Sequence, residues 1–158
     1  MTDNYIGIMI ESLWRKKNVL TDILKLSEEQ SLLLDDPNLE PDTFEKNVNR
    51  KAALIEKLEQ LDTGFESLYD KVKEELESNR DIHKEQIRQM QELIRALTEL
   101  NMQIQATEAR NKEKATAKFA YIRQQAKEIR SSQKIVKEYY NNMMHKAYNE
   151  PHFLDNKK

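Results

Sequence analysis

Residues 54–72, LIEKLEQLDTGFESLYDKV, decide the fold of this chain. Their large apolar residues are spaced by four, three, four, three and four positions, which is the repeat of a coiled-coil-like helical seam. Gly64 interrupts this seam and indicates a close helix crossing or a slight kink, because glycine costs about 1 kcal/mol relative to alanine inside a helix. The stretch therefore predicts a long helix that packs along the face of Leu54, Leu58, Leu61, Phe65, Leu68 and Val72.

The region before this seam predicts the start of the same helix and a separate first helix. Asp42-Thr43-Phe44-Glu45 resembles a capping box with Asp in place of Ser or Thr. Residues 35–41 contain two prolines and should form a connection. We expect the first helix to begin after Asp3 or Asn4 and to stop near Leu34. Its apolar stripe is Ile6, Ile10, Leu13, Leu20 and Leu24, widened by Met9, Ile23 and Leu26.

Beyond the seam, a short break is expected around Ser78-Asn79, and neither Gly nor Pro follows between residues 80 and 150. One helix of about 65 residues, roughly 100 Å long, is the first expectation for this region. It carries an apolar stripe (Ile87, Met90, Ile94, Leu97, Ile104), then a polar stretch over residues 105–118 that should serve as a rigid spacer or a place to bend. The apolar stripe resumes at Phe119 with Ile122, Ala126, Ile129, Val136, Tyr140 and Met143.

Short loops predict antiparallel neighbours, so residues equally distant from Ser78 should lie side by side. By this count the chain beyond about residue 115 has no partner in the first two helices. The predicted fold is all-α: a long antiparallel three-helix bundle with an extended C-terminal helix. Its parts are a bundle over residues 1–114, an amphipathic extension over 115–148 and a tail over 149–158. The extension is expected to pair with another copy, fold back as a fourth helix, or await a partner helix.

Composition narrows the function classes. The 158 residues include 2 Gly, 3 Pro and no Cys, and the formal net charge is -2. No disulfide or thiolate chemistry is available, and we expect no signal peptide, no membrane insertion and a cytoplasmic location. Residues 110–130 hold seven basic and two acidic side chains, a net of +5. Because these charges spread around the helix, they indicate a solubilising face or steering of an acidic partner, and no nucleic-acid partner is expected.

The residues that commonly carry chemistry are sparse. His83, His145 and His152 form no metal-ligand spacing and are expected to be solvated. No phosphate-binding loop or nucleophile elbow occurs, so we expect neither an enzyme nor a cofactor or metal. Trp14 has two possible roles, covering the edge of the seam or serving as an exposed anchor for a partner.

Six segments form an ordered set along essentially the whole chain: residues 10–13 (IESL), 51–58 (KAALIEKL), 61–69 (LDTGFESLY), 71–76 (KVKEEL), 132–134 (SQK) and 139–143 (YYNNM). The set includes Asp-x-Gly-Phe inside a predicted helix. This ordered set resembles the FlgN-type flagellar export chaperones in the form seen in clostridial bacteria.

The resemblance implies a cytoplasmic chaperone that binds the helical termini of hook-associated, or hook-filament junction, proteins and keeps them unassembled before export. It also implies that the C-terminal amphipathic helix binds this cargo, and that a tyrosine after this helix docks on the flagellar export gate. Tyr139-Tyr140 stands there without the glycine of the family's Ser-Leu-Tyr-Gly. A structural coiled-coil protein, with a homodimer seam in the C-terminal helix, is the alternative. The predicted partner-binding residues are Phe119, Ile122, Ala126, Ile129, Val136, Tyr139, Tyr140 and Met143.

Overall fold

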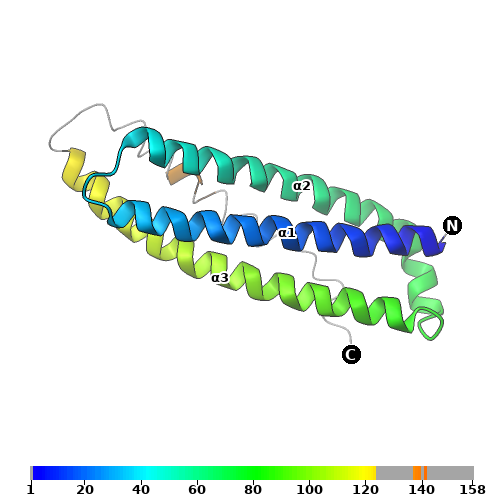
Figure 1. Ribbon diagram of the computed structural model, residues 1–158. Coiled ribbons are helices and arrows are strands. Elements are labelled where there is room, and N and C mark those ends of the chain that lie inside the picture. Colours follow the sequence, from blue (N-terminus) through cyan, green and yellow to red (C-terminus); the bar gives the residue numbers. More distant parts are fainter. Residues whose placement is uncertain (1, 124–136, 140, 142–158) are drawn as a thin grey trace.

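The computed structural model describes residues 2–123, 137–139 and 141. Three long helices account for nearly all of them: α1 (Thr2–Asp35), α2 (Pro41–Ser78) and α3 (Lys84–Arg123). They lie side by side, with α1 between α2 and α3, and the direction of the chain reverses at each connection (Figure 1). The predicted all-α bundle of three long helices is therefore confirmed, and no strand occurs in the described part of the chain.

The three helices do not all pack on one another, because α1 lies between the other two. This helix packs along both α2 and α3, whereas no Cα atoms of α2 and α3 lie within 8 Å of each other. The side chains of α2 and α3 nevertheless meet near one end of the bundle. There the rings of Phe44 and Phe119 are 5.4 Å apart and nearly perpendicular. We call the side on which α2 and α3 meet only through side chains the α2/α3 side.

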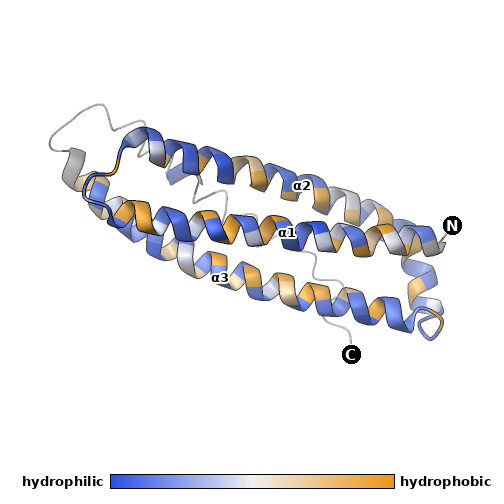
Figure 2. Ribbon diagram, viewed as in Figure 1, coloured by the Kyte–Doolittle hydropathy of each residue, from blue (hydrophilic) through white to orange (hydrophobic). Residues whose placement is uncertain are grey.

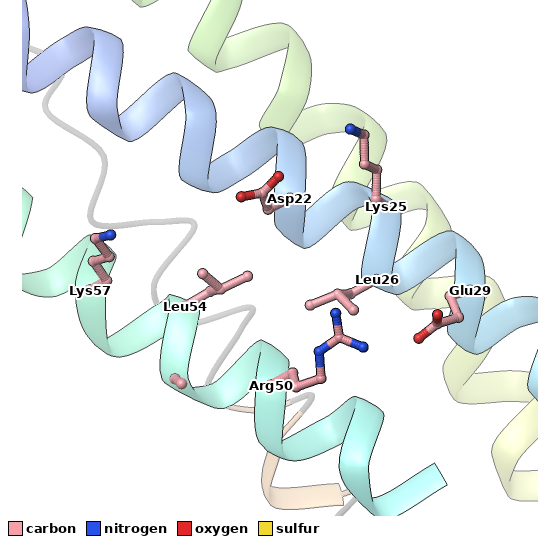
Figure 3. Close-up of a pocket in the computed structure, with 8 residues that line it drawn as sticks. Asp22, Lys25, Leu26, Glu29, Arg50, Leu54 and Lys57 are labelled. Atoms are coloured by element: carbon pink, nitrogen blue, oxygen red, sulfur yellow. The ribbon is translucent and has the colours of Figure 1, made fainter. Parts of the chain in front are cut away.

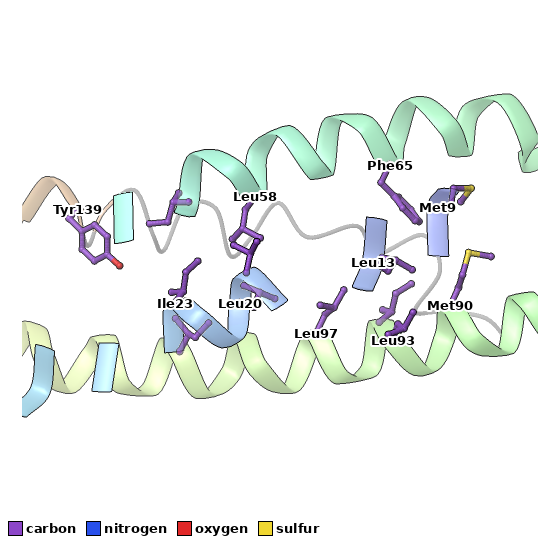
Figure 4. Packing of buried hydrophobic residues seen from close by; sticks show 14 of the residues in the cluster. Met9, Leu13, Leu20, Ile23, Leu58, Phe65, Met90, Leu93, Leu97 and Tyr139 are labelled. Carbon is purple, nitrogen blue, oxygen red and sulfur yellow. The ribbon is translucent and has the colours of Figure 1, made fainter. Parts of the chain in front are cut away.

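The predicted apolar stripes form the core. Hydrophobic and hydrophilic residues alternate along each helix in Figure 2, and Figure 4 shows the hydrophobic ones converging between the helices. Along the deciding stretch, Leu58, Phe65 and Val72 are buried, while Leu54, Leu61 and Leu68 are partly buried and pack against them. Every second residue of the heptad pattern is therefore fully buried, and the residues between them line the edge of the core. From α1 and α3 the buried stripe residues are Ile6, Met9, Leu13, Leu20, Ile23, Leu26, Ile87, Met90, Ile94, Leu97 and Ile104.

The predicted capping box at Asp42-Thr43-Phe44-Glu45 is wrong. The N-cap residue is Glu40, which makes no capping hydrogen bond through its side chain, and Pro41 occupies the first helical turn. Proline is well suited to that turn, because its fixed φ matches the helix and it lacks an N–H that would otherwise be left without an acceptor. Asp42 still favours the helix start, since its negative charge lies near the positive end of the helix dipole.

The close helix crossing expected at Gly64 does not occur. This residue is exposed within α2, and a Cβ atom placed on it would meet nothing within 4 Å. No neighbouring helix approaches closely enough to require a glycine there. The glycine interrupts the sequence pattern without marking a crossing point.

The turn between α2 and α3 begins where expected, at Ser78-Asn79, but α3 begins later, at Lys84. Within this turn His83 is buried, so its predicted solvated state is wrong. Nε2 of its ring lies 3.0 Å from Glu75 Oε2, and Nδ1 lies 3.2 Å from Gln86 Oε1. The histidine thus joins the end of α2 to the start of α3.

These turn residues also change the pairing of the helices. The connection occupies residues 79–83, so residues of α2 and α3 that lie opposite each other are equally distant from the middle of this turn and not from Ser78. The side chains of α3 consequently meet α1 and α2 as far as Phe119, four residues beyond the point where the sequence count ended their contact. The part of α3 before Phe119 therefore does not project beyond the bundle.

The expected single straight helix after residue 80 does not occur. The Glu108 carboxylate and the Tyr139 ring both contact the ammonium group of Lys51. In one straight helix, residues 108 and 139 would be about 46 Å apart at 1.5 Å per residue. Residue 139 therefore returns to the bundle, as in the fold-back arrangement, and the short helical piece at 137–139 lies beside α2 (Figure 1).

Candidate partner-binding surface

The structure describes three of the eight predicted partner-binding residues. Phe119 is buried near the end of α3, and Tyr139 is buried on the α2/α3 side. Ile122 lies in the last turn of α3. The other five lie outside the described residues: Ala126, Ile129, Val136, Tyr140 and Met143. Phe119 contacts Phe44, whereas Tyr139 contacts Lys51, which lies seven positions further along α2.

Phe119 lies within the end of the bundle and not on a free face. Its ring packs edge-on against Phe44, and Ala115, one turn earlier, is buried as well. Two lysines of the basic stretch fasten the same part of α3 to the end of α1. Lys114 Nζ donates to Asp35 Oδ2 at 2.9 Å, and Lys118 Nζ donates to the main-chain oxygen of Asp36 at 2.6 Å. A cation at the C-terminal end of a helix is favoured by the helix dipole, so these contacts stabilise the bundle end.

A buried polar cluster lies between this end and the apolar core. At its centre is Lys51, whose side chain is 0% exposed and whose ammonium group donates to Oε1 of Glu108 at 2.7 Å. The same ammonium group donates to Gln30 Oε1 at 3.1 Å and Ser27 Oγ at 3.4 Å. Lys51 thus binds groups from α1 and α3 at once and fixes the register of all three helices.

Two asparagines extend this cluster along α1. Asn111 donates through its side-chain amide to the main-chain oxygen of Ser27 at 2.8 Å and to Gln30 Oε1 at 3.2 Å. Asn47 donates to the main-chain oxygen of Leu26 at 3.0 Å. Buried polar groups that are hydrogen-bonded specify one packing arrangement, because any slip of register would leave them without partners.

The charges in the cluster carry a cost of desolvation. Burial lowers the pKa of Lys51 below its ordinary value, although the nearby Glu108 charge and its hydrogen bond act in the opposite direction. Glu108 is also buried, and its second carboxylate oxygen, Oε2, makes no hydrogen bond to the described residues. Removal of an ion pair from water offsets much of its Coulomb attraction, so this pair specifies geometry more than it adds stability.

Tyr139 closes the cluster from the α2/α3 side. Its ring centroid is 4.4 Å from Lys51 Nζ, within the range of a cation–π contact, and the residue is 6% exposed. Figure 4 shows the ring between α2 and α3, at one end of the row of apolar side chains. The described neighbours Lys137, Glu138 and Asn141 are all exposed, so Tyr139 is the one described residue after α3 that is buried.

The sequence did not predict this cluster, although the signal was present. Residues 105–118 contain no large apolar residue, and this absence alone predicts a spacer. Ile104, Glu108, Asn111, Ala115 and Phe119 nevertheless follow one another at intervals of four, three, four and four, and all five are buried. A helical stripe that includes polar residues would have identified the seam, with polar partners at matching positions in α1 and α2.

Two shallow pockets lie on other faces of the bundle. One, of about 670 Å³, lies between α1 and α2 (Figure 3). Leu26 and Leu54 form its apolar base, and its rim mixes both signs of charge: Asp22, Glu29, Lys25, Arg50 and Lys57. The smaller, of about 300 Å³, contains Trp14 beside Leu93 and Ala96. Trp14 is 50% exposed with Lys17 Nζ 4.9 Å from its ring, so it both borders the seam and faces solvent.

Two other kinds of feature are absent from the described residues. No group of three or more His, Cys, Asp and Glu side chains in that part of the chain is placed to hold a metal ion. None of its helices combines the length and the apolar character that crossing a bilayer requires.

Comparison with known proteins assigns the family. The model of the FlgN protein family matches residues 1–145, which include all three helices and all eight predicted partner-binding residues. No curated protein and no solved structure matches the chain. FlgN proteins are flagellar export chaperones, and theirs is not an enzyme family. The match covers far more than half of the sequence, and the chain therefore belongs to the FlgN family.

Proposed function

We propose that this chain is a cytoplasmic chaperone of flagellar type III export that binds the helical termini of hook-associated proteins and keeps them unassembled before export. The proposed binding surface is the apolar face that begins with Ile122, in the last turn of α3, and continues through Ala126, Ile129 and Val136 to Tyr139, Tyr140 and Met143. The proposed division of the chain shifts accordingly, with the bundle extending to Arg123 and the partner-binding segment following it.

One observation carries this proposal. The stripe of α3 is engaged by α1 and α2 as far as Phe119, yet apolar residues at helical spacing continue for some twenty positions beyond it. The family match continues through the same residues, to position 145. A helix with an apolar face gains most of its stability when that face is covered, so a partner helix is a suitable ligand for this segment.

The charges support a partner with acidic residues. Within the basic stretch, Lys114 and Lys118 are bonded to the end of α1. Arg123, Lys127 and Arg130 follow on the same segment as the apolar face. Basic residues at the edge of an apolar face accelerate encounter with an acidic partner and select its orientation.

The test is truncation after Arg123, which preserves Ala115 and Phe119 in the bundle. The shortened chain should keep its helical circular dichroism and cooperative unfolding, and should lose binding to a purified hook-associated protein in titration calorimetry. A full-length chain with Met102→Ser, an exposed position on α3, is the control and should bind normally. Equal binding by the shortened and full-length chains would contradict the proposal.

A homodimer seam is the competing role for the same residues. Sedimentation velocity at low micromolar concentration separates the two roles. A chaperone should be converted into a complex with the hook-associated protein when that protein is added. A tight dimer that stays unchanged after the addition would instead assign the face to self-association.

A further inference from the structure

The side of α2 that borders α1 on the outside of the bundle carries a row of basic and neutral side chains. Positions three and four apart lie on one side of a helix. The row has such positions between residues 50 and 71, all of them exposed, and none of them is acidic. The acidic residues of α2 all lie at other positions of the helix. We call this row the basic strip: Arg50, Ala53, Lys57, Gln60, Gly64, Ser67 and Lys71.

The basic strip follows the groove between α1 and α2, which we call the α1/α2 groove. At one end of the strip, Arg50, Ala53 and Lys57 line the pocket of about 670 Å³ that α1 and α2 form together. At the other end, Lys71 Nζ lies 5.3 Å from the ring centroid of Tyr5 in α1. From residue 50 to residue 71 the strip is about 30 Å long, at 1.5 Å per residue.

The base of the α1/α2 groove is apolar and only partly covered. Leu54 lines the pocket and faces Leu26 of α1 (Figure 3). Leu61 and Leu68 follow Leu54 at intervals of seven residues, which places them on the same side of α2, and all three leucines are partly buried against the core. A row of leucines at this interval is a surface that the side-chain ridge of another helix can fill.

The charges on the two rims of the groove differ. Arg50 and Lys57 on α2 are both exposed, and neither forms an ion pair with a described residue. The α1 rim carries both signs, since Lys25 lies between Asp22 and Glu29. The α2 rim therefore has one sign of charge and no counter-charge of its own, which indicates a ligand with acidic groups along that rim.

The shape of the groove favours one helix over a second bundle. A groove between two packed helices accepts the ridge of a single helix. A second copy of this chain would present another two-helix face with a groove of its own. The long charged side chains on the two sets of rims would meet before the leucines at the base of either groove.

We propose that the α1/α2 groove docks an amphipathic helix of a partner protein, with its apolar residues on Leu54, Leu61 and Leu68 and with acidic residues along the edge beside Arg50 and Lys57. Acidic residues seven positions apart on the partner match the spacing of Arg50 and Lys57 and select the direction in which the helix lies. This surface shares no residue with the face assigned to hook-associated proteins, so the proposal does not depend on that assignment.

Two synthetic helical peptides are the probes for this site. Both have about six turns, which matches the length of the basic strip, and both carry leucines along one face. The acidic peptide has glutamates at seven-residue intervals along one edge of that face, and the basic peptide has lysines at the same positions. The two peptides thus differ only in the sign of charge that they offer to the α2 rim.

The two glycines of the chain provide the readout. Full-length protein labelled with nitrogen-15 at glycine alone has two amide signals, from Gly64 in the basic strip and from Gly7 in α1. Gly7 is seven positions from Trp14 and so lies on the side of α1 that borders the other pocket. Gly64→Ala identifies the two signals, because it removes one of them.

The acidic peptide should shift the Gly64 signal in a saturable titration and leave the Gly7 signal in place. The basic peptide should bind about tenfold more weakly, because it brings like charges beside Arg50 and Lys57. A titration that moves neither signal, or moves both alike, would overturn the proposal.

Charge reversal then locates the preference in the strip. Arg50→Glu combined with Lys57→Glu should invert it, so that the basic peptide shifts the Gly64 signal and binds about tenfold more tightly than the acidic one. Arg95→Glu combined with Lys112→Glu, at exposed positions of α3, changes the net charge equally and should keep the preference of the parent. Circular dichroism of both variants should match that of the parent.

Two further outcomes would contradict the proposal. A preference that survives reversal in the strip, or that the α3 pair inverts equally, would place the acidic peptide elsewhere on the protein. A parent chain that sediments as a dimer without peptide and becomes monomeric after Arg50→Glu and Lys57→Glu would assign the groove to a second copy.

Discussion

Lys51 and Glu108 form an ion pair of 2.7 Å, with 0% and 3% of their side chains exposed, at the centre of the buried polar cluster that borders the apolar core. The pair joins α2 to α3, the two helices that have no direct backbone packing. It therefore connects α2 directly to α3. Removal of one member of the pair and removal of both should have different effects on the free energy of unfolding.

Loss of one partner should be worse than loss of both. Glu108→Ala leaves the Lys51 ammonium buried without its counter-charge, and we expect a loss of about 3–5 kcal/mol in the free energy of unfolding. Lys51→Met combined with Glu108→Leu replaces the pair by apolar side chains of similar size, and we expect stability near that of the parent or above it. Urea denaturation followed by circular dichroism measures both. Equal losses in the single and double variants would show that the pair itself supplies the stability.

Phe119 should behave as a core residue. Phe119→Ala removes a buried ring and is expected to cost about 3–5 kcal/mol of unfolding free energy. A double-mutant cycle with Phe44→Ala should give a coupling of about 0.5–1.5 kcal/mol from the edge-to-face contact. Met102→Ala, exposed on the same helix, is the control and should change stability by no more than about 0.5 kcal/mol. A Phe119→Ala variant as stable as this control would place the ring outside the core.

Gly64→Ala should stabilise the protein. A Cβ at this position meets nothing within 4 Å, so the substitution adds helix propensity without a clash. The expected gain is about 0.5–1 kcal/mol in the free energy of unfolding. Ala53→Gly, at an exposed position of the same helix, is the reverse control and should lose a similar amount. A loss of stability in Gly64→Ala would indicate that a neighbour approaches this site more closely than the structure shows.

The turn between α2 and α3 should make stability depend on pH through Glu75. The hydrogen bond from His83, and then that from Asn79, lower the pKa of this carboxyl below its ordinary value. A carboxyl with a lowered pKa in the folded state contributes stability above its unfolded pKa, and that contribution is lost as the pH falls through the folded value.

Glu75→Gln should therefore be less stable than the parent at pH 7, and the difference should shrink steadily as the pH falls below about 4.5. Urea denaturation at several pH values between 7 and 3 measures this difference. Glu74→Gln, at an exposed neighbouring position, should show little pH-dependent difference from the parent. A constant difference between Glu75→Gln and the parent at all pH values would exclude the proposed linkage.

The apolar pattern was sufficient to predict the helices and most of the core. Leu58, Phe65 and Val72 are buried as the heptad predicts, because apolar burial dominates the choice of helix face. The pattern failed where polar residues occupy core positions. Lys51, Glu108 and Asn111 look like surface residues in isolation, and their burial is acceptable only because matching partners on other helices satisfy them.

The position of Tyr139 was also not predictable from local sequence, because it depends on a residue far away in the chain. No local signal distinguishes a straight helix from one that returns, since neither Gly nor Pro marks the reversal. The return is instead stabilised by Lys51, 88 positions before Tyr139 in sequence. The residues of the candidate face could thus be predicted from the sequence, but the contact of Tyr139 with Lys51 could not.

The sequence separation of the buried polar contacts also bears on the order of folding during synthesis. Asn111 bonds to the main chain of Ser27, 84 residues before it, and Glu108 follows Lys51 by 57 residues. When α1 and α2 leave the ribosome as a hairpin, the ammonium group of Lys51 still lacks its counter-charge and stays in water. Contacts of such long range form late, after the local helices. The bundle therefore becomes stable only when the second half of α3 has been made. A chain whose synthesis stops before Glu108 is expected to be incompletely folded when it leaves the ribosome, and therefore accessible to proteases.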